Sequence, residues 1–129
     1  MTVRRIARCA CGRMEAVCTG EPLSVSLCHC EACRRRTGSA FGVAVFYARE
    51  DVTVTGDWAT FERPSDAGFP VAFHFCPACG TTLWWEPRRL PGRVAVALGA
   101  FAGDETPAPV QQVHVHQRLD WLALDIPEK

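Results

Sequence analysis

The chain has 129 residues, of which 48% are hydrophobic, and its 14 basic side chains balance its 14 acidic ones. This length fits a single domain over residues 1–129, and the hydrophobic content argues against a disordered chain. The neutral balance makes a nucleic-acid-binding protein an unfavourable interpretation, because such proteins usually carry a strongly basic surface.

Short runs of β-prone residues, separated by glycine and proline, predict a mainly β fold with little helix. The expected strands are residues 3–9, 13–18, 24–28, 41–47, 52–55, 58–61, 71–75, 81–85, 93–99 and 110–116. Most of them should pair antiparallel, and 52–55 should form a hairpin with 58–61 across Gly56. One or two helical turns are expected within residues 30–37, ended by Gly38.

Seven of the eight cysteines fall into three short clusters. The clusters are Cys9 with Cys11, Cys28 with Cys30 and Cys33, and Cys76 with Cys79. Thiolates two or three residues apart can bind one cation without straining the backbone, and clusters brought together by folding form a sulfur-rich zinc site. Two closed tetrahedral sites need eight ligands. Seven clustered thiolates therefore indicate one closed site and one site with an open position.

A disulfide framework is the alternative use of eight cysteines, but it requires an oxidising compartment. The basic N-terminus is not followed by an apolar run, so it does not read as a secretory signal. No apolar stretch approaches the roughly 18 residues of a membrane span. Cys28 and Cys30 are also too close in sequence to bridge each other easily. We therefore expect bound metal, a cytoplasmic location and no membrane contact.

Several other residues have weaker functional signals. Cys18 lies in an alternating strand and is expected to be a small buried hydrophobe, with a role as eighth metal ligand as the alternative. His29 stands between two thiolates, so its ring should point away from the metal and support the turn by a hydrogen bond. His114 and His116 should share one strand face, in a packing or surface role.

The aromatic side chains are expected mostly in the core, although some of them could wall a substrate cleft. They are Phe41, Phe46, Phe73, Trp84, Trp85 and Trp121. Glu62 and Asp66, in a polar segment, are weak candidates for a general base.

The cysteine clusters and their flanking residues resemble the glutathione-dependent formaldehyde-activating enzyme family, whose domain is shared with centromere-protein-V-like proteins. The matching segments are Cys9-Ala-Cys11-Gly12, Cys28-His29-Cys30-x-x-Cys33-Arg34-Arg35-x-x-Gly38-Ser39-Ala40-Phe41 and Phe75-Cys76-x-x-Cys79-Gly80-Thr81-x-Leu83. The stretch from Pro109 through His114 to Trp121 is similar to the family's last strand and tail. The resemblance implies a β-sandwich related to the Mss4-like zinc proteins and a carbon–sulfur lyase-type activity that joins glutathione and formaldehyde reversibly.

Carried over to this chain, the family pattern assigns the seven clustered cysteines to two zinc sites. Cys9, Cys11, Cys76 and Cys79 would form a closed structural site. Cys28, Cys30 and Cys33 would hold a second zinc with one open position, which is the ligand count of a catalytic site. An open thiolate-rich zinc favours capture of the substrate thiol over polarisation of the aldehyde, since three thiolates already make it electron-rich.

Arg34 and Arg35 follow the second cluster and match the family pattern, and Arg36 ranks below them because it does not. Their guanidinium groups could dock the carboxylates of a glutathione-like partner, or they could be a solvated helix face that balances the thiolate charge. Two other functions stay open: a zinc-stabilised binding module without catalysis, and a redox sensor whose three-thiolate site loses metal on oxidation.

Overall fold

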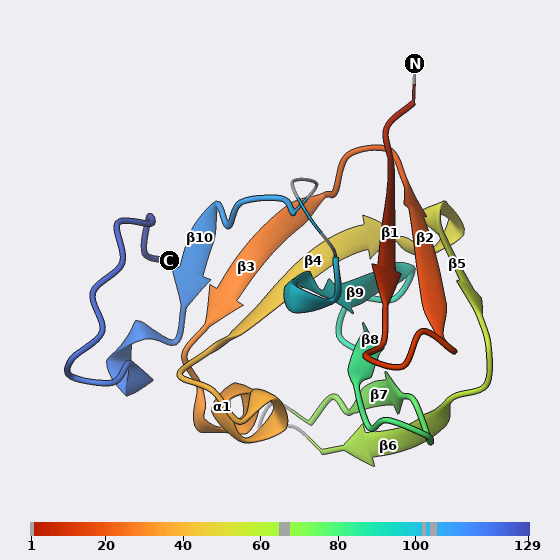
Figure 1. Cartoon of the computed structure of the whole chain (residues 1–129). Helices are drawn as coiled ribbons and strands as arrows, with labels where there is room; N and C mark the ends of the chain where they lie inside the picture. Colours follow the sequence, from red (N-terminus) through yellow and green to blue (C-terminus); the bar gives the residue numbers. More distant parts are fainter. Residues whose placement is uncertain (1, 65–67, 102, 104–105) are drawn as a thin grey trace.

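The computed structural model describes residues 2–64, 68–101, 103 and 106–129, and it is mainly β, as predicted (Figure 1). A three-stranded antiparallel sheet has the order β1 (Arg4–Arg8), β2 (Glu15–Thr19) and β5 (Val52–Thr55). A seven-stranded sheet has the order β10 (Gln111–Val113), β3 (Ser24–Cys28), β4 (Gly42–Ala48), β9 (Arg93–Ala97), β8 (Thr82–Pro87), β7 (Val71–Phe75) and β6 (Ala59–Arg63). Within the described ranges the single α-helix is α1 (Glu31–Thr37).

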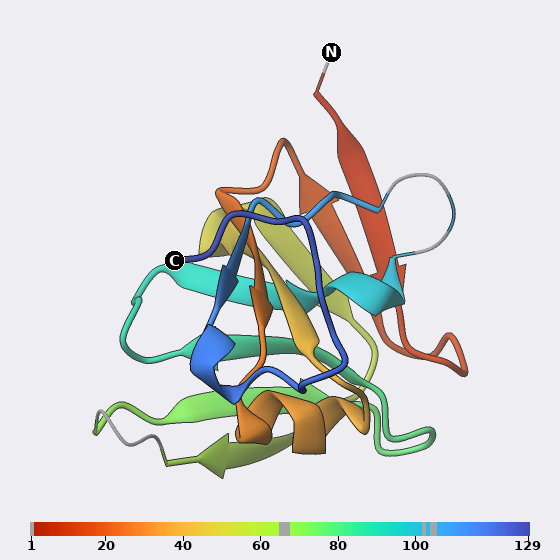
Figure 2. The ribbon, with the colours of Figure 1, turned by 90° about the vertical axis from the view of Figure 1, so that its left-hand side faces the viewer.

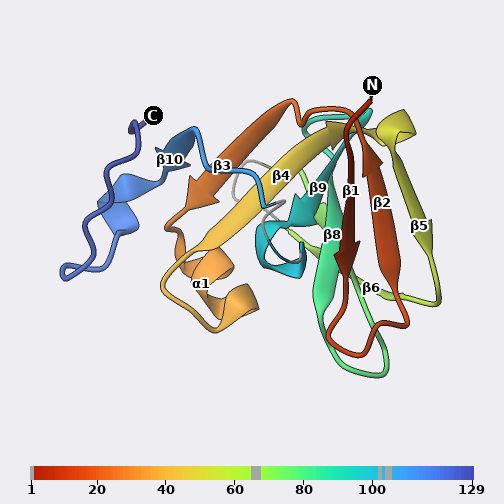
Figure 3. The same cartoon turned by 45° about the horizontal axis from the view of Figure 1, so that its top comes forward.

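Short 3-10 turns occupy Arg49–Asp51, Leu98–Ala100 and Val115–Gln117. Figure 3 shows the small sheet to one side of the molecule and β10 and β3 on the other side, with β4 running across between them. Helix α1 follows β3 directly and leads through a short loop into β4. None of the helices in the described ranges is long and apolar enough to cross a membrane.

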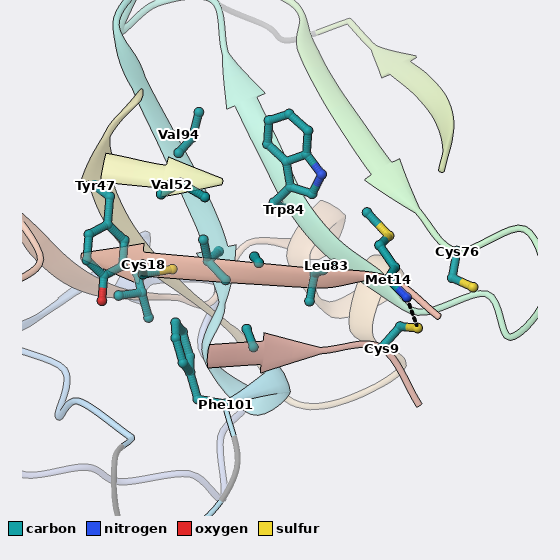
Figure 4. Close-up of a cluster of buried hydrophobic side chains, with 14 of the residues drawn as sticks. Cys9, Met14, Cys18, Tyr47, Val52, Cys76, Leu83, Trp84, Val94 and Phe101 are labelled. Carbon is teal, nitrogen blue, oxygen red and sulfur yellow. Dashed lines mark hydrogen bonds between the residues drawn. The ribbon is translucent and has the colours of Figure 1, made fainter. Parts of the chain in front are cut away.

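The main core lies between the small sheet and one face of the large sheet (Figure 4). Successive strand residues point to opposite faces, so Trp84 packs into this core whereas Trp85 packs with Phe73 on the other face. Burial of each large apolar side chain contributes about 2 kcal/mol to stability. The core therefore holds the small sheet, with its Cys9–Cys11 turn, firmly against β8.

The predicted hairpin of residues 52–55 with 58–61 is wrong. Strand β5 pairs with β2, and β6 pairs with β7 in the other sheet. The reason lies at Gly56, which has a φ of 93° and whose backbone lies against the carbonyl of Arg13, so closely that no side chain would fit there. Val52 joins the core beside Cys18, and the chain then crosses from one sheet to the other.

The predicted last strand, residues 110–116, is shorter than expected and pairs in parallel with β3. His114 has left-handed backbone (φ 53°), which ends β10, and residues 115–117 form a 3-10 turn. His114 and His116 consequently do not share a strand face, although both are exposed. Trp121 also differs from expectation: its side chain is 73% exposed rather than in the core.

Candidate metal centres

The four-cysteine centre is built from two hairpin turns that lie far apart in sequence. The β1–β2 turn carries Cys9 and Cys11, and the β7–β8 turn carries Cys76 and Cys79, with all four sulfur atoms within 4.8 Å of one another. The Sγ atom of Cys11 lies 3.6 Å from that of Cys9 and 3.7 Å from that of Cys76. A tetrahedral zinc with bonds of about 2.3 Å places its sulfur ligands about 3.8 Å apart. The donor set therefore fits zinc.

Backbone hydrogen bonds shape and join these two turns. Gly80 N–H donates to the carbonyl of Cys76 at 2.8 Å, and the positive φ of 80° at Gly80 suits glycine. Ala10 N–H donates to the hydroxyl of Thr81 at 3.0 Å, which ties one turn to the other. The Thr81 hydroxyl also lies 3.3 Å from the Cys79 sulfur, and hydrogen bonding by Thr81 lowers the pKa of Cys79 to about 5. Cys79 is thus held as the thiolate that a metal needs.

The three-cysteine centre lies where β3 passes into α1. Cys28 ends the strand, Cys30 is the N-cap of the helix, and Cys33 is in its first turn, where its N–H donates to the Cys30 sulfur at 3.4 Å. The three sulfur atoms lie within 4.8 Å of one another. In the part of the chain that the structure describes, no fourth Cys, His, Asp or Glu joins this group. Its three donors fit a zinc site that keeps one position for another ligand.

The thiols of this centre differ in acidity. A hydrogen bond from Cys28 lowers the pKa of Cys33 to about 5, and the pKa of Cys28 is raised in return. The positive charges of Arg36 and Arg63 lower the pKa of Cys33 further. These contacts favour the thiolate form of Cys33, which is the form that binds a metal.

Arg36 is the arginine of α1 whose side chain lies against Cys33. Its guanidinium carbon lies 4.3 Å from the centroid of the Trp85 ring and 5.7 Å from that of Phe73. The family pattern favours Arg34 and Arg35 over Arg36, yet Arg36 stands three residues after Cys33. On a helix this spacing places two side chains on one face, and this was the signal that could have identified it.

The side chains of Arg34 and Arg35 make different contacts from that of Arg36. Arg35 is exposed and pairs with Glu31 at 2.8 Å, one helical turn earlier. The Nε atom of Arg34 is buried without a hydrogen-bond partner in the described structure. Their predicted role in docking a carboxylate stays a prediction.

An open cavity of about 640 Å³ lies beside the four-cysteine centre and the C-terminal end of α1. Cys79 and Gly80 of the four-cysteine centre line one part of it, and Arg36 and Gly42 line another. A Cβ atom on Gly42 would stand 2.7 Å from Nη2 of Arg36 and 3.3 Å from Cβ of Cys33. Because Gly42 has no side chain, Arg36 and Cys33 pack directly behind this part of the wall; Arg36 also lines the cavity, whereas Cys28, Cys30 and Cys33 do not. Phe41 also lines this cavity, as a cleft wall rather than as buried core.

The remaining candidates lie elsewhere. Cys18 is fully buried in the main core, as predicted, and its burial raises its pKa to about 12 (Figure 4). His29 makes a hydrogen bond, as predicted, but to the side chain of Gln112 rather than within its own turn. Glu62 is exposed on β6 and pairs with Arg88 at 3.3 Å. Asp66 lies outside the described residues.

Comparisons with known proteins agree with this arrangement. The family model of the glutathione-dependent formaldehyde-activating enzyme matches residues 4–117, which include both cysteine centres. A crystal structure of a Rhodobacter sphaeroides protein has a similar fold, with a TM-score of 0.60 and 22% sequence identity over 76% of this chain and 88% of that chain. At this identity the likeness concerns the fold alone. A comparison with curated proteins finds no match.

Proposed function

The chain belongs to the glutathione-dependent formaldehyde-activating enzyme family, and from this premise we propose that it forms or cleaves the adduct of a small thiol, such as glutathione, with formaldehyde. In the forming direction a bond arises between the thiol sulfur and the carbonyl carbon. The carbonyl double bond becomes a single bond to a hydroxyl, which receives the proton lost by the thiol. Nothing is oxidised or reduced. The activity is therefore that of a carbon–sulfur lyase run in either direction.

The observation that carries this proposal is the three-cysteine centre, which has no fourth ligand among the described residues and lies behind Gly42 and Arg36 in the wall of a cavity of about 640 Å³. Such a volume is within the range of small-molecule sites. Cys28, Cys30 and Cys33 would hold a zinc ion with one open coordination position, which would favour a thiolate and lower the pKa of an incoming thiol. The four-cysteine centre has all its ligands within the chain, so we assign it a structural role.

Basic side chains that line the cavity are candidates for binding the carboxylates of the substrate. Arg36 lies beside Cys33 and lines the cavity, and Arg8 lines it as well. Both can attract the carboxylates of a glutathione-like peptide. Arg34 and Arg35, on the same helix, remain proposed partners for a carboxylate.

The test is the rate at which the protein interconverts free glutathione and its formaldehyde adduct, followed by NMR exchange of ¹³C-labelled formaldehyde. We expect exchange above the spontaneous rate, and we expect Cys33→Ser to abolish the increase while the protein stays folded. Comparison of the exchange rates with glutathione, cysteine and 2-mercaptoethanol shows whether the protein recognises the glutathione peptide or only the thiol group. No acceleration with any thiol, in a protein that binds zinc at the four-cysteine centre, would favour the binding module instead.

A further inference from the structure

The C-terminal segment, residues 118–129, lies beyond the range matched by the family model, yet it returns to the sheet edge next to the three-cysteine centre (Figures 1 and 2). Gln112 N–H donates to the carbonyl of Pro127 at 2.8 Å, and Lys129 N–H donates to the carbonyl of Gln112 at 2.9 Å. Arg118 and Glu128 pair across the segment at 3.3 Å. The chain end thus covers the free edge of β10.

The Gln112 side chain extends this contact toward the cysteines. It is fully buried, and its Nε2 donates to the carbonyls of Leu124 at 3.2 Å and Ile126 at 2.8 Å. An amide nitrogen has two donors, so both are used by the C-terminal segment. The Oε1 atom is then fixed toward His29, whose Nε2 lies 2.7 Å away. Because Oε1 can only accept, Nε2 of His29 carries the hydrogen atom and donates the hydrogen bond to Oε1 of Gln112.

His29 transmits this contact to the metal ligands, because it stands between Cys28 and Cys30 and is fully buried. Its Nδ1 has no hydrogen-bond partner among the described residues, so the bond to Gln112 is the one polar contact that orients the ring. The His29 backbone N–H donates to the carbonyl of Val113 at 3.2 Å. One residue after Cys30, Glu31 N–H donates to Oε1 of Gln117 at 3.0 Å. Both flanks of Cys30 are therefore held by residues 112–117.

We propose that the C-terminal segment positions the three-cysteine centre, and that Gln112 is the positioning residue that connects them. The segment fixes the Gln112 amide, the amide fixes His29, and His29 fixes the turn that carries Cys28 and Cys30. Groups that orient metal ligands commonly change metal affinity by about 10- to 100-fold when removed. This inference rests on the metal binding assumed under the proposed function.

The test uses the full-length protein, freed of metal and titrated with Co²⁺ at one pH, with the thiolate-to-cobalt absorption as signal. The four-cysteine centre should fill first and the three-cysteine centre second. Gln112→Leu keeps the size of the side chain but removes its three hydrogen bonds. We expect the Kd of the second step to rise about tenfold or more and that of the first step to change less than about twofold.

Gln111→Leu is the matched control, since Gln111 is the neighbouring residue of β10 and its side chain bonds to Ser26 at 3.2 Å instead of to the C-terminal segment. Its second-step Kd should equal that of the unaltered protein. Equal second-step values for Q112L and Q111L would overturn the proposal. So would an equal loss at both steps in Q112L, because Gln112 would then support only the fold. A protein without any second step contradicts the proposed function rather than this inference.

If Q112L does not fold, Gln117→Ala decides the question, because its side chain is only half-buried and contacts the backbone N–H of Glu31. We then expect the second-step Kd to rise about threefold or more, with Q111L again as the unchanged control. An unchanged Kd in Q117A would then overturn the proposal. In the unaltered protein, filling the second step should also slow hydrogen exchange at Lys129 N–H, since coupling between two sites is reciprocal.

Discussion

The guanidinium carbon of Arg36 lies 4.3 Å from the centroid of the Trp85 ring. Trp85 is on the face of β8 that points away from the main core, and α1 lies beside that face. A desolvated cation–π contact contributes about 2 kcal/mol. The contact therefore attaches the end of α1 to the large sheet and keeps a positive charge between Cys33 and the cavity.

Arg36→Met keeps much of the side-chain volume and removes the charge. We expect kcat/KM for the glutathione–formaldehyde adduct to fall about tenfold or more, because the variant lacks the charge beside Cys33 and the cavity. Steady-state kinetics on R36M, R35M and R88M provides the comparison, with Arg88 as an exposed control that pairs with Glu62. A larger loss in R35M than in R36M would favour the assignment made from sequence over the one made from geometry.

Gly42→Ala tests the same contact from the other side. Gly42 has no positive φ, so alanine strains no backbone there, but its methyl group would meet Nη2 of Arg36 at 2.7 Å. The flexible end of Arg36 can move, so we expect little change in melting temperature and a several-fold loss of activity. Gly99→Ala is the control, because Gly99 lines the same cavity and has open space around its Cβ position. Equal activities of G42A and G99A would contradict this role of Arg36.

Removal of one ligand should separate the two centres. Cys79→Ser breaks the link between the two hairpin turns, and we expect the free energy of unfolding to fall by about 2–5 kcal/mol. Cys33→Ser should change it much less while abolishing activity, because its centre lies within one local segment. Chemical denaturation and zinc content per chain check both variants. Equal destabilisation by the two variants would argue against a division into structural and catalytic sites.

Cys18→Ala distinguishes a core cysteine from an eighth metal ligand. The side chain is fully buried and belongs to neither cysteine centre. We expect about 1–2 kcal/mol lower stability and an unchanged metal content by mass spectrometry of the native protein. Loss of one metal ion on this substitution would show that Cys18 closes the second site.

The raised pKa of Cys18 also predicts a pH dependence. Burial raises this pKa from 9.0 to about 12, so the folded protein keeps the thiol protonated between these values while the unfolded chain ionises it. The contribution of Cys18 to stability is complete below pH 9 and is lost as pH rises from 9 toward 12. At pH 10 the unaltered protein should have lost about 1.4 kcal/mol of its stability advantage over C18A. A stability difference that is constant between pH 8 and 10 would contradict this burial effect.

Sequence patterns within a few residues were sufficient to predict some strands and the end of the helix. Alternating residues located β2 and β3, and Gly38 marked the end of α1, where its φ is 64°. The hairpin predicted at Gly56 was wrong because strand pairing depends on contacts with Arg13 and Cys18, which are distant in sequence. Strand β10 ends early because the backbone of His114 is left-handed. None of the residue types next to His114 predicts this conformation.

The grouping of seven cysteines and the family follow from the amino-acid order alone, because ligand spacing is a local property of the chain. The spacing of Cys33 and Arg36 also puts both on one face of α1, but folding was needed to bring that face against Trp85 and the cavity. Arg36 reaches Cys33 and Trp85 because α1 packs on the large sheet, whereas Arg35, one residue earlier, points to solvent. The link from the C-terminal segment through Gln112 to His29 joins residues that are 83 positions apart, and such contacts arise only when the strands have paired.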